Sequence, residues 1–159
     1  MPEPVLDFRV RRVLLEDFDS WRRLWDGYNE FYGRVGPDAL PEATTLKTWE
    51  RFFDSREAVY AIVADCGDQL VGIAHYVFHR STTRLNEVCY LNDLFSIEKV
   101  RGRGVGRRLI ETVYAHAQNA GCESVYWQTH ETNSQAMALY DKLAKRSGFV
   151  VYSKILSQV

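Results

Sequence analysis

The sequence has few cysteines, no long apolar run and no excess of one charge. Its three cysteines, Cys66, Cys89 and Cys122, are odd in number and far apart, which argues against a disulfide framework and a zinc ribbon. No stretch approaches the length of a membrane span, and the opening "MPEPVLDFRV" lacks the apolar region of a signal peptide. We therefore expect a cytoplasmic protein with reduced thiols and no membrane partner.

The charges nearly cancel, at 20 basic against 21 acidic residues, so a polycationic nucleic-acid binder is excluded. At 159 residues and 46% hydrophobic content, the chain predicts one soluble domain, 1–159, with a sizeable core. The four histidines show no metal-ligand spacing, so we expect no metal and structural roles for His75, His79, His116 and His130.

Hydrophobic periodicity predicts both strands and helices. Strands are expected over 7–13, 57–65, 70–79, 85–97, 123–130 and 149–156, and helices over 16–33, 44–54, 105–120 and 133–147, with Thr45 as a cap and Gly33, Gly121 and Gly148 as stops. A strand meander followed by a strand–loop–helix–strand crossover makes a mixed α/β (α+β) sheet with helices on its faces.

The stretch "VRGRGVG" (100–106) joins a predicted strand to a predicted helix and is rich in glycine and arginine. Backbone amides and the helix dipole at such a junction favour a phosphate. Arg107 and Arg108 follow the last glycine where a triphosphatase loop needs Lys and Ser or Thr. The G-x-G-x-x-G spacing of a dinucleotide site also fails. A phosphate loop of another kind, or a solvated basic rim, remains.

Arg101-Gly102-Arg103-Gly104-Val105-Gly106 resembles the R-x-x-G-x-G pyrophosphate loop of the GNAT N-acetyltransferase superfamily. Downstream, "TNSQAMALYDKL" resembles the family's N-x-x-A-x-x-L-Y-x-x-L block, and Gly148-Phe149 follows it. The two motifs stand in the family's order, and the resemblance covers essentially the whole chain. "YLND" and "SVYWQTHETN" are most similar to the branch of histone and polyamine acetyltransferases.

The resemblance implies a largely antiparallel sheet whose parallel fourth and fifth strands splay apart, with acetyl-CoA as cosubstrate. The pyrophosphate would rest on backbone amides near 102–107, and the pantetheine arm would lie in the splay. The residues implied for acetyl-CoA are Leu94, Phe95, Ser96, Arg101, Gly102, Arg103, Gly104, Val105, Gly106, Arg107, Asn133 and Tyr140.

Direct acyl transfer requires the amine to lose a proton and the departing thiolate to gain one. The resemblance implies Tyr140 as the proton donor. In the diamine acetyltransferase branch, whose "YLED" segment "YLND" resembles, the glutamate implicated as the general base aligns with Asn92, which cannot take a proton. Alternation along the strand places Asp93 on the opposite face of the sheet unless a β-bulge intervenes. Asp93, Glu87 and a water chain ordered by Asn92 stay open as the base.

The first predicted helix carries aromatic and acidic side chains, which suit a cationic amine. Trp21 to Tyr28 is expected to be mainly core, while the residues expected to bind substrate are Asp26, Tyr28, Glu30 and Tyr32. A polyamine, a lysine-like small molecule or a protein or peptide lysine all fit. The rival hypotheses are a CoA-binding sensor or scaffold and a transferase that uses another acyl donor.

Only one predicted strand, 149–156, follows the Gly148-Phe149 pair, where many members of the family have two. A lone terminal strand leaves a sheet edge exposed. We therefore expect a homodimer in which the C-terminal strand pairs with, or is exchanged into, a second subunit.

Overall fold

The computed structural model describes residues 1–157. The strands are β1 (Arg9–Arg12), β2 (Val59–Asp65), β3 (Leu70–His79), β4 (Val88–Ser96) and β5 (Val125–Tyr126), and the α-helices are α1 (Phe18–Phe31), α2 (Glu42–Arg51), α3 (Val105–Asn119) and α4 (Ser134–Leu143). The chain forms two compact units, one spanning Met1–Gln128 and one that begins at Thr129. The expectation of a single domain over 1–159 stays a prediction.

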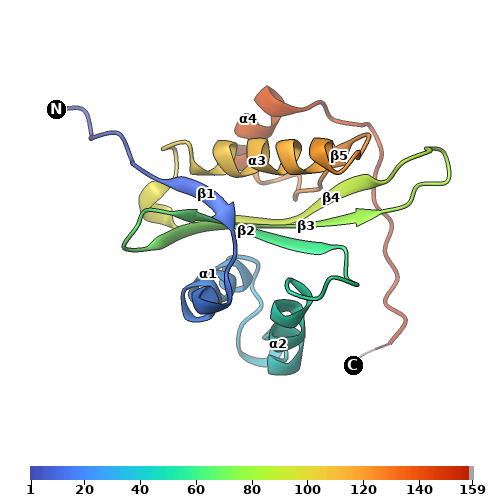
Figure 1. Ribbon diagram of the computed structural model, residues 1–159, viewed down its shortest axis with the longest axis horizontal. Coiled ribbons are helices and arrows are strands. Elements are labelled where there is room, and N and C mark those ends of the chain that lie inside the picture. The colour runs from blue at the N-terminus through green and yellow to red at the C-terminus, as the bar shows by residue number, and fades with distance from the viewer. Residues whose placement is uncertain (158–159) are drawn as a thin grey trace. The chain divides into compact units, whose positions relative to one another are not determined.

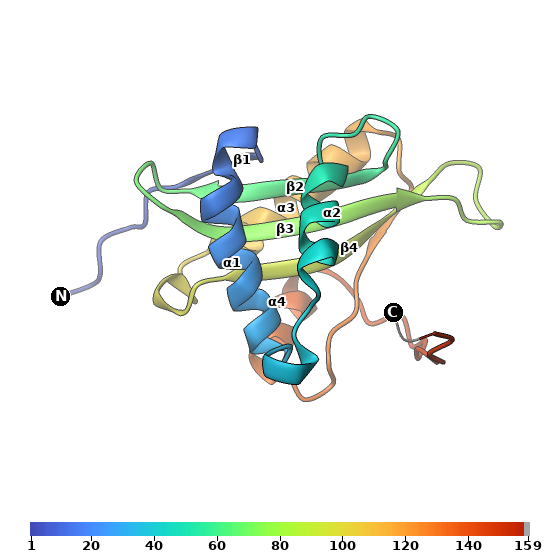
Figure 2. The ribbon, with the colours of Figure 1, turned by 90° about the horizontal axis from the view of Figure 1, so that it is seen from below.

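The first unit contains a five-stranded sheet in the order β1-β2-β3-β4-β5. Neighbouring strands are antiparallel except β4 and β5, which are parallel, so the predicted meander and crossover are confirmed. The helices α1 and α2 lie side by side on one face of the sheet, and α3 covers the other (Figures 1 and 2). The mixed fold with helices on both faces is therefore as expected.

Two irregularities in β4 prepare the site. The register pairs His75 with Asp93 but Tyr76 with Leu91, so Asn92 is an extra residue in a β-bulge. Pairing with β5 is limited to Cys89 with Val125 and Tyr90 with Tyr126. Beyond Tyr90, β4 is hydrogen-bonded within the described sheet only to β3, which is the predicted splay.

The face of α1 that meets the sheet is aromatic. Trp21, Leu24, Trp25 and Tyr28 recur every three or four residues and are at most 7% exposed, which confirms the predicted core stripe. Full burial of such side chains contributes roughly 1.5–3 kcal/mol each. The helix ends at Phe31, two residues before the αL residue Gly33, which stands just past its C-cap as predicted.

The predicted cap of the second helix is wrong. The helix α2 begins at Glu42 after Pro41, and Thr45 lies within it, buried, with its hydroxyl oxygen accepting a 3.1 Å hydrogen bond from the Trp25 indole. The Thr45 hydroxyl therefore serves a contact between α1 and α2, which the local sequence pattern does not predict.

The helix α3 is anchored where it begins. Gly104, with φ of 88°, precedes it, and the αL residue Gly121 follows its end as predicted. An added Cβ on Gly72 of β3 would lie 2.9 Å from Val105 and 3.1 Å from Leu109. The missing side chain therefore lets α3 approach the sheet closely at its first turn.

In the second unit, two predictions are wrong. The helix α4 ends at Leu143, and Ala144 is extended (φ −152°, ψ −179°), so Gly148 is not its stop. Residues 149–157 form no strand, because the described part of this unit contains no other strand with which to pair. Their large apolar side chains are exposed, among them Phe149, Val151, Tyr152, Ile155 and Leu156.

Candidate active site

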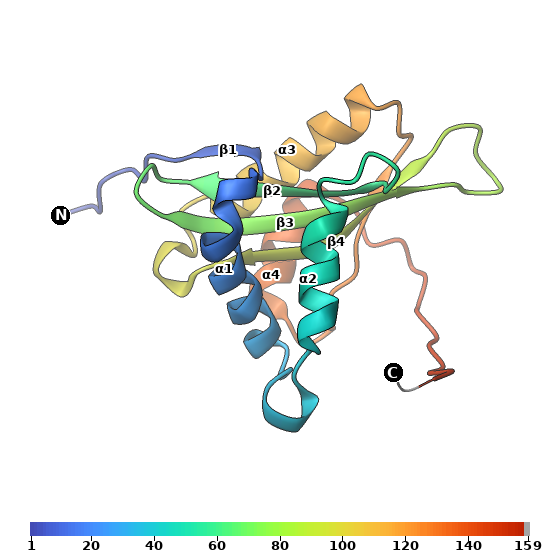
Figure 3. The same ribbon diagram turned by 60° about the horizontal axis from the view of Figure 1, so that its bottom comes forward.

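A pocket of about 360 Å³ lies on the face of the sheet that α1 and α2 cover. Figure 3 shows the two helices crossing β3 and β4, with their connecting loop beyond the sheet. The pocket is lined by residues of both helices, of the loop and of strands β2 to β4. These residues are Trp25, Tyr28, Asn29, Arg34, Leu40, Thr44, Thr48, Arg51, Phe52, Val59, His75, Val77, Asn92 and Asp93.

The bulge in β4 brings both Asn92 and Asp93 to this pocket. Simple alternation predicted opposite faces for the two side chains, and the extra residue corrects that expectation. The Asn92 amide donates a 3.0 Å hydrogen bond to Oδ1 of Asp93. Glu87, the other carboxylate considered as a base, precedes the first residue of β4 and is not among the described residues that line the pocket.

Sequence reasoning missed His75, which it treated as an ordinary structural histidine. Its Nδ1 lies 2.9 Å from Oδ2 of Asp93, and its Nε2 lies 3.0 Å from the Trp21 indole nitrogen. The indole N–H only donates, so Nε2 accepts and the proton of the neutral ring sits on Nδ1. His75, at 2% exposure, therefore donates to Asp93. Only the strand pairing and the packing of α1 reveal this contact.

The Asp93 carboxylate is charged at neutral pH. Burial alone would raise its pKa, but hydrogen bonds from His75, Tyr28 and Asn92 outweigh burial and hold the pKa below its usual value. Burial, and next the charge of Asp93, raise the pKa of the Tyr28 hydroxyl well above its usual value. Tyr28 thus stays protonated and able to donate to Asp93.

The four residues predicted to bind substrate are not brought together. Tyr28 lines the pocket, and the Tyr32 ring lies 4.9 Å from the Tyr28 ring. Asp26 instead pairs with Arg22 at 3.0 Å on the exposed side of α1. Neither Asp26 nor Glu30 is among the described residues that line the pocket.

The glycine loop has the shape of an anion cradle. Gly102 and Gly104 adopt φ of 77° and 88°, and a Cβ on either would meet no atom within 4 Å, so the loop faces open space. The first α-helical hydrogen bond of α3 is donated by Arg108 to Gly104. The amides of Val105, Gly106 and Arg107 precede it and are therefore available to a ligand.

The arginines of the loop differ in their contacts. Arg101 stacks over Phe31 and Phe95 and donates to the Ser96 carbonyl at 3.3 Å. Arg103 donates to the Pro4 carbonyl at 2.7 Å and lies 3.7 Å from Glu3, while Arg107 lies 3.7 Å from Glu111. Each of them is thus held by the protein itself.

The predicted strand contacts lie beyond the splay. Leu94, Phe95 and Ser96 pair with β3 through Ala74, Ile73 and Gly72, and lie past the last β5 pair at Tyr90. Their other edge is consequently not paired with another strand of the described sheet.

Asn133 and Tyr140 belong to the second unit and are described within it. Asn133 stands at the N-cap of α4, but its side-chain oxygen accepts no capping hydrogen bond from the helix, and its amide nitrogen donates to the Thr129 hydroxyl at 3.2 Å. Tyr140 lies in the second half of α4.

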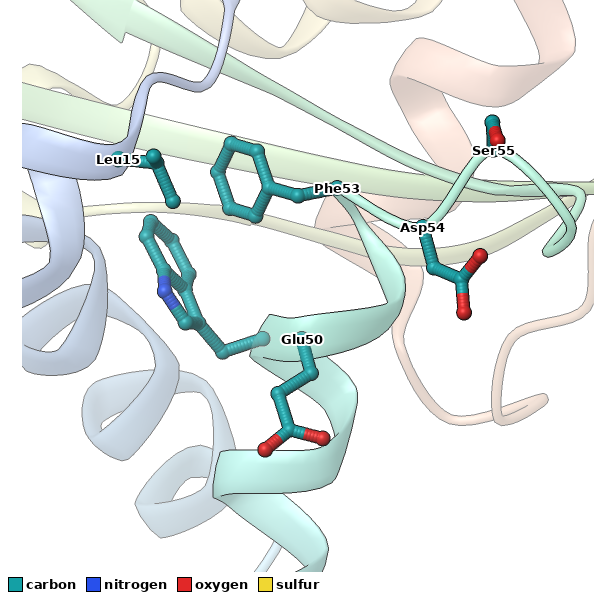
Figure 4. Close-up of a pocket in the computed structure, with 6 residues that line it drawn as sticks. Leu15, Glu50, Phe53, Asp54 and Ser55 are labelled. Carbon is teal, nitrogen blue, oxygen red and sulfur yellow. The ribbon is translucent and has the colours of Figure 1, made fainter.

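A second hollow, of about 480 Å³, opens beside α2 (Figure 4). Leu15, Trp49 and Phe53 form its apolar part, and the Glu50 and Asp54 carboxylates point away from Leu15 and Phe53. Glu50 already pairs with Lys47 at 2.6 Å, and Asp54 with Arg56 at 2.9 Å. Both carboxylates of the hollow are therefore already paired with cations of the protein.

Among residues 1–157, no group of three or more His, Cys, Asp or Glu side chains is placed to hold a metal ion. In the same residues, every helix is too short or too polar to cross a membrane.

A mixed sheet splayed between β4 and β5, a glycine loop opening α3 and a carboxylate at the splay define an acyltransferase of the GNAT type. The model of the acetyltransferase (GNAT) family matches residues 21–144. The chain belongs to this family and is an N-acetyltransferase, because the match covers more than half of it.

A curated relative supports this membership. The D-amino-acid N-acetyltransferase HPA3 of Saccharomyces cerevisiae is 37% identical over 158 residues, which cover 96% of this chain and 95% of the relative. The thialysine N-epsilon-acetyltransferase of Bos taurus is 32% identical over 77 residues, covering 48% and 45%.

Solved structures share the fold. A probable acetyltransferase has a TM-score of 0.81 at 24% identity and covers 95% of this chain and 99% of its own. The structure of AAC(6')-Iy in complex with the bisubstrate analogue CoA-S-monomethyl-acetylneamine has a TM-score of 0.80 at 17% identity, with the same coverage.

Proposed function

We propose that this enzyme transfers an acetyl group from acetyl-CoA to the primary amine of a small molecule, directly, in a ternary complex. The observation that carries the proposal is the Asp93 carboxylate, which accepts hydrogen bonds from His75 and Asn92 and lines a pocket of about 360 Å³ where β4 leaves β5. That volume suits a metabolite-sized acceptor. The rival role of sensor without catalysis rested on asparagine at position 92, and Asp93 supplies the acidic group beside it.

Asp93 holds and orients the amine in this proposal. An ammonium group has an ordinary pKa of about 10.4, far above that of a carboxylate, so Asp93 attracts the cation but is a poor final acceptor of its proton. The proton passes to water at the open side of the pocket, where the exposed Asn92 lies. The neutral amine is then aligned for attack on the thioester carbonyl.

Acetyl-CoA supplies the activated acetyl group as a thioester. The amides of 102–107 would hold its pyrophosphate and the open edge of Leu94–Ser96 its pantetheine arm. Arg101, Arg103 and Arg107 stand beside that cradle. Asn133 would contact the same arm, and Tyr140 would protonate the departing thiolate, as the family resemblance implies.

A free amino acid is the acceptor we favour. The relative that matches nearly the whole chain acts, by its name, on D-amino acids, and another acts on thialysine. Polyamines and lysine-like molecules belong in the same substrate panel.

We also propose a cytoplasmic homodimer formed through the C-terminal segment 149–157. That segment is not a strand in the isolated chain, and its apolar side chains are exposed, Phe149 by 91% and Tyr152 by 93%. A second copy would give both the side chains and the backbone a partner.

A thiol-release assay tests the activity. Purified protein with acetyl-CoA should release CoA only when an amine is present, over a panel of D- and L-amino acids, polyamines, aminoglycosides and basic peptides. Thermal unfolding should shift upward with acetyl-CoA and CoA but not with ATP. No amine-dependent release across the panel, with a normal shift by CoA, would favour the sensor.

A further inference from the structure

Arg34, in the loop after α1, is an exposed residue that lines the pocket. Its guanidinium carbon lies 5.8 Å from the centre of the Tyr28 ring and 5.4 Å from that of Tyr32. Its Nη1 donates a 3.1 Å hydrogen bond to Oδ1 of Asn29. Stacking and a directed hydrogen bond together limit the freedom of this side chain.

Asn29 is built to hold that arginine. It is 6% exposed, its amide nitrogen donates to the Trp25 carbonyl at 2.8 Å, and its own carbonyl accepts from the Arg34 backbone at 2.9 Å. The Asn29 side-chain oxygen is thereby aimed at the guanidinium. Because the buried side chain of Asn29 holds an exposed arginine in one orientation, we interpret that orientation as functional.

No carboxylate among residues 1–157 forms an ion pair with Arg34. The other arginine of the pocket, Arg51, lies 4.0 Å from Glu57. Asp93 in turn accepts from Asn92 and from His75, whose ring is neutral while its Nε2 accepts from Trp21, and within residues 1–157 no Lys or Arg pairs with it. The pocket therefore contains one oriented positive and one oriented negative group, neither of them neutralised.

Tyr28 links the two charges. Its hydroxyl interacts with Asp93, and its ring lies beside Arg34. A ligand that crosses the Tyr28 ring would meet the carboxylate at one end and the guanidinium at the other.

We propose that Arg34 binds the carboxylate of the acceptor, and that the acceptor is a zwitterionic amino acid with its α-amine at Asp93. This inference rests on the proposed function. Arginine suits the role because its planar donors match both oxygens of a carboxylate. A polyamine would place a second positive charge against Arg34 and Arg51 and is disfavoured by repulsion.

Matched pairs of acceptors test the inference. Phenylalanine in both configurations is compared with phenethylamine, and lysine with cadaverine, because each pair differs by the carboxylate alone. The wild type should show a kcat/KM at least ten-fold higher for the amino acid of the accepted configuration. Arg34→Gln should raise KM for that amino acid at least ten-fold, leave KM for the amine within two-fold, and change kcat little. Arg34→Lys should recover part of the loss.

The matched control is Arg56→Gln, since Arg56 is 88% exposed, pairs with Asp54 and is not among the described residues that line the pocket. Equal KM values for acid and amine, or an unchanged selectivity in Arg34→Gln, would overturn the inference while the acetyltransferase function stood. Should no amine be acetylated at all, the proposed function fails. Calorimetry of phenylalanine binding to wild type and Arg34→Gln in the presence of CoA then decides the inference separately.

Discussion

The buried imidazole of His75 donates a 2.9 Å hydrogen bond to the carboxylate of Asp93 across the β4 bulge. Because Trp21 occupies the other ring nitrogen at 3.0 Å, the donor direction is fixed. A charged group whose side chain is only 11% exposed is costly unless such donors surround it. The contact thus explains how the sheet keeps an ionised carboxylate at the pocket.

Removing that charge should impair catalysis more than folding. Asp93→Asn keeps the shape and an oxygen for His75, and we expect kcat/KM to fall about 10²–10³-fold, the usual scale for a lost acid–base or charge-orienting group. Steady-state kinetics with acetyl-CoA and the best amine measure it. Asn92→Ser is the control, since Asn92 is exposed, and should cost less than about five-fold. The reverse order of effects would assign the role to position 92.

The His75 contact should appear in the pH profile. His75→Leu removes the hydrogen bond that contributes most to stabilising the charged carboxylate, so burial then raises the pKa of Asp93. The carboxylate is then protonated at higher pH, and the acid limb of the kcat/KM profile should move to higher pH. His75→Gln, which retains a donor, should restore most of the wild-type limb. A drop in activity equal at every pH would indicate a purely structural role.

Much of the fold is readable from the sequence because its signals are local. The aromatic spacing of α1, the apolar runs of β2 and β3, and the glycine before α3 each report their own element. The family motifs then supply the order of strands. The expected strand ends differ from the observed ones by a few residues, most at β5, which is only Val125–Tyr126.

The misses share a physical cause, which is contact between distant segments. The role of Thr45 depends on Trp25, and that of His75 on Trp21 and Asp93. The facing of Asp93 depends on a bulge, where one inserted residue reverses alternation. The segment 149–156 has the composition of a strand but, in its own unit, no partner to pair with.

The glycine loop should bind acetyl-CoA through its backbone. Gly104→Ala places a side chain at φ 88°, which costs roughly 1 kcal/mol in strain and disturbs the amides at the start of α3. We expect the Kd for acetyl-CoA to rise at least ten-fold. Gly67→Ala, at φ 95° in the β2–β3 turn, is the matched control. It should lose similar stability in urea and keep the wild-type Kd, and equal effects of the two would argue against the loop as the cradle.

Stability at neutral pH should depend on Arg11. Its guanidinium donates two hydrogen bonds to Asp17, at 2.7 and 3.0 Å, and one to Asp65 at 2.9 Å. The Arg11 side chain holds the pKa of Asp17 below its usual value, and the Gly67 amide followed by Arg11 does so for Asp65. Arg11→Met removes the guanidinium from the two nearly buried carboxylates of Asp17 and Asp65. We expect the free energy of unfolding at pH 7 to fall by about 3 kcal/mol.

The sign of the pH dependence follows from the lowered pKa values. Carboxylates with a folded-state pKa below the unfolded value of about 3.9 stabilise the fold above that pH and lose this contribution as pH falls through the folded value. Urea unfolding should therefore show the gap between wild type and Arg11→Met shrinking below about pH 4. Arg9→Met, at a 77% exposed position 3.6 Å from Asp65, should change stability by less than about 0.5 kcal/mol at either pH.

The C-terminal segment should determine the oligomeric state. Phe149, Val151 and Tyr152 are 91%, 71% and 93% exposed in the isolated chain, and their burial in a second copy would favour association by the hydrophobic effect. Light scattering after gel filtration at micromolar concentration should give the mass of a dimer for the wild type and of a monomer for Val151→Asp/Tyr152→Asp. Lys154→Asp, a charge change in the same segment that removes no apolar surface, should remain a dimer. A monomeric wild type would refute the dimer, and a dimeric double variant would move its interface to another surface.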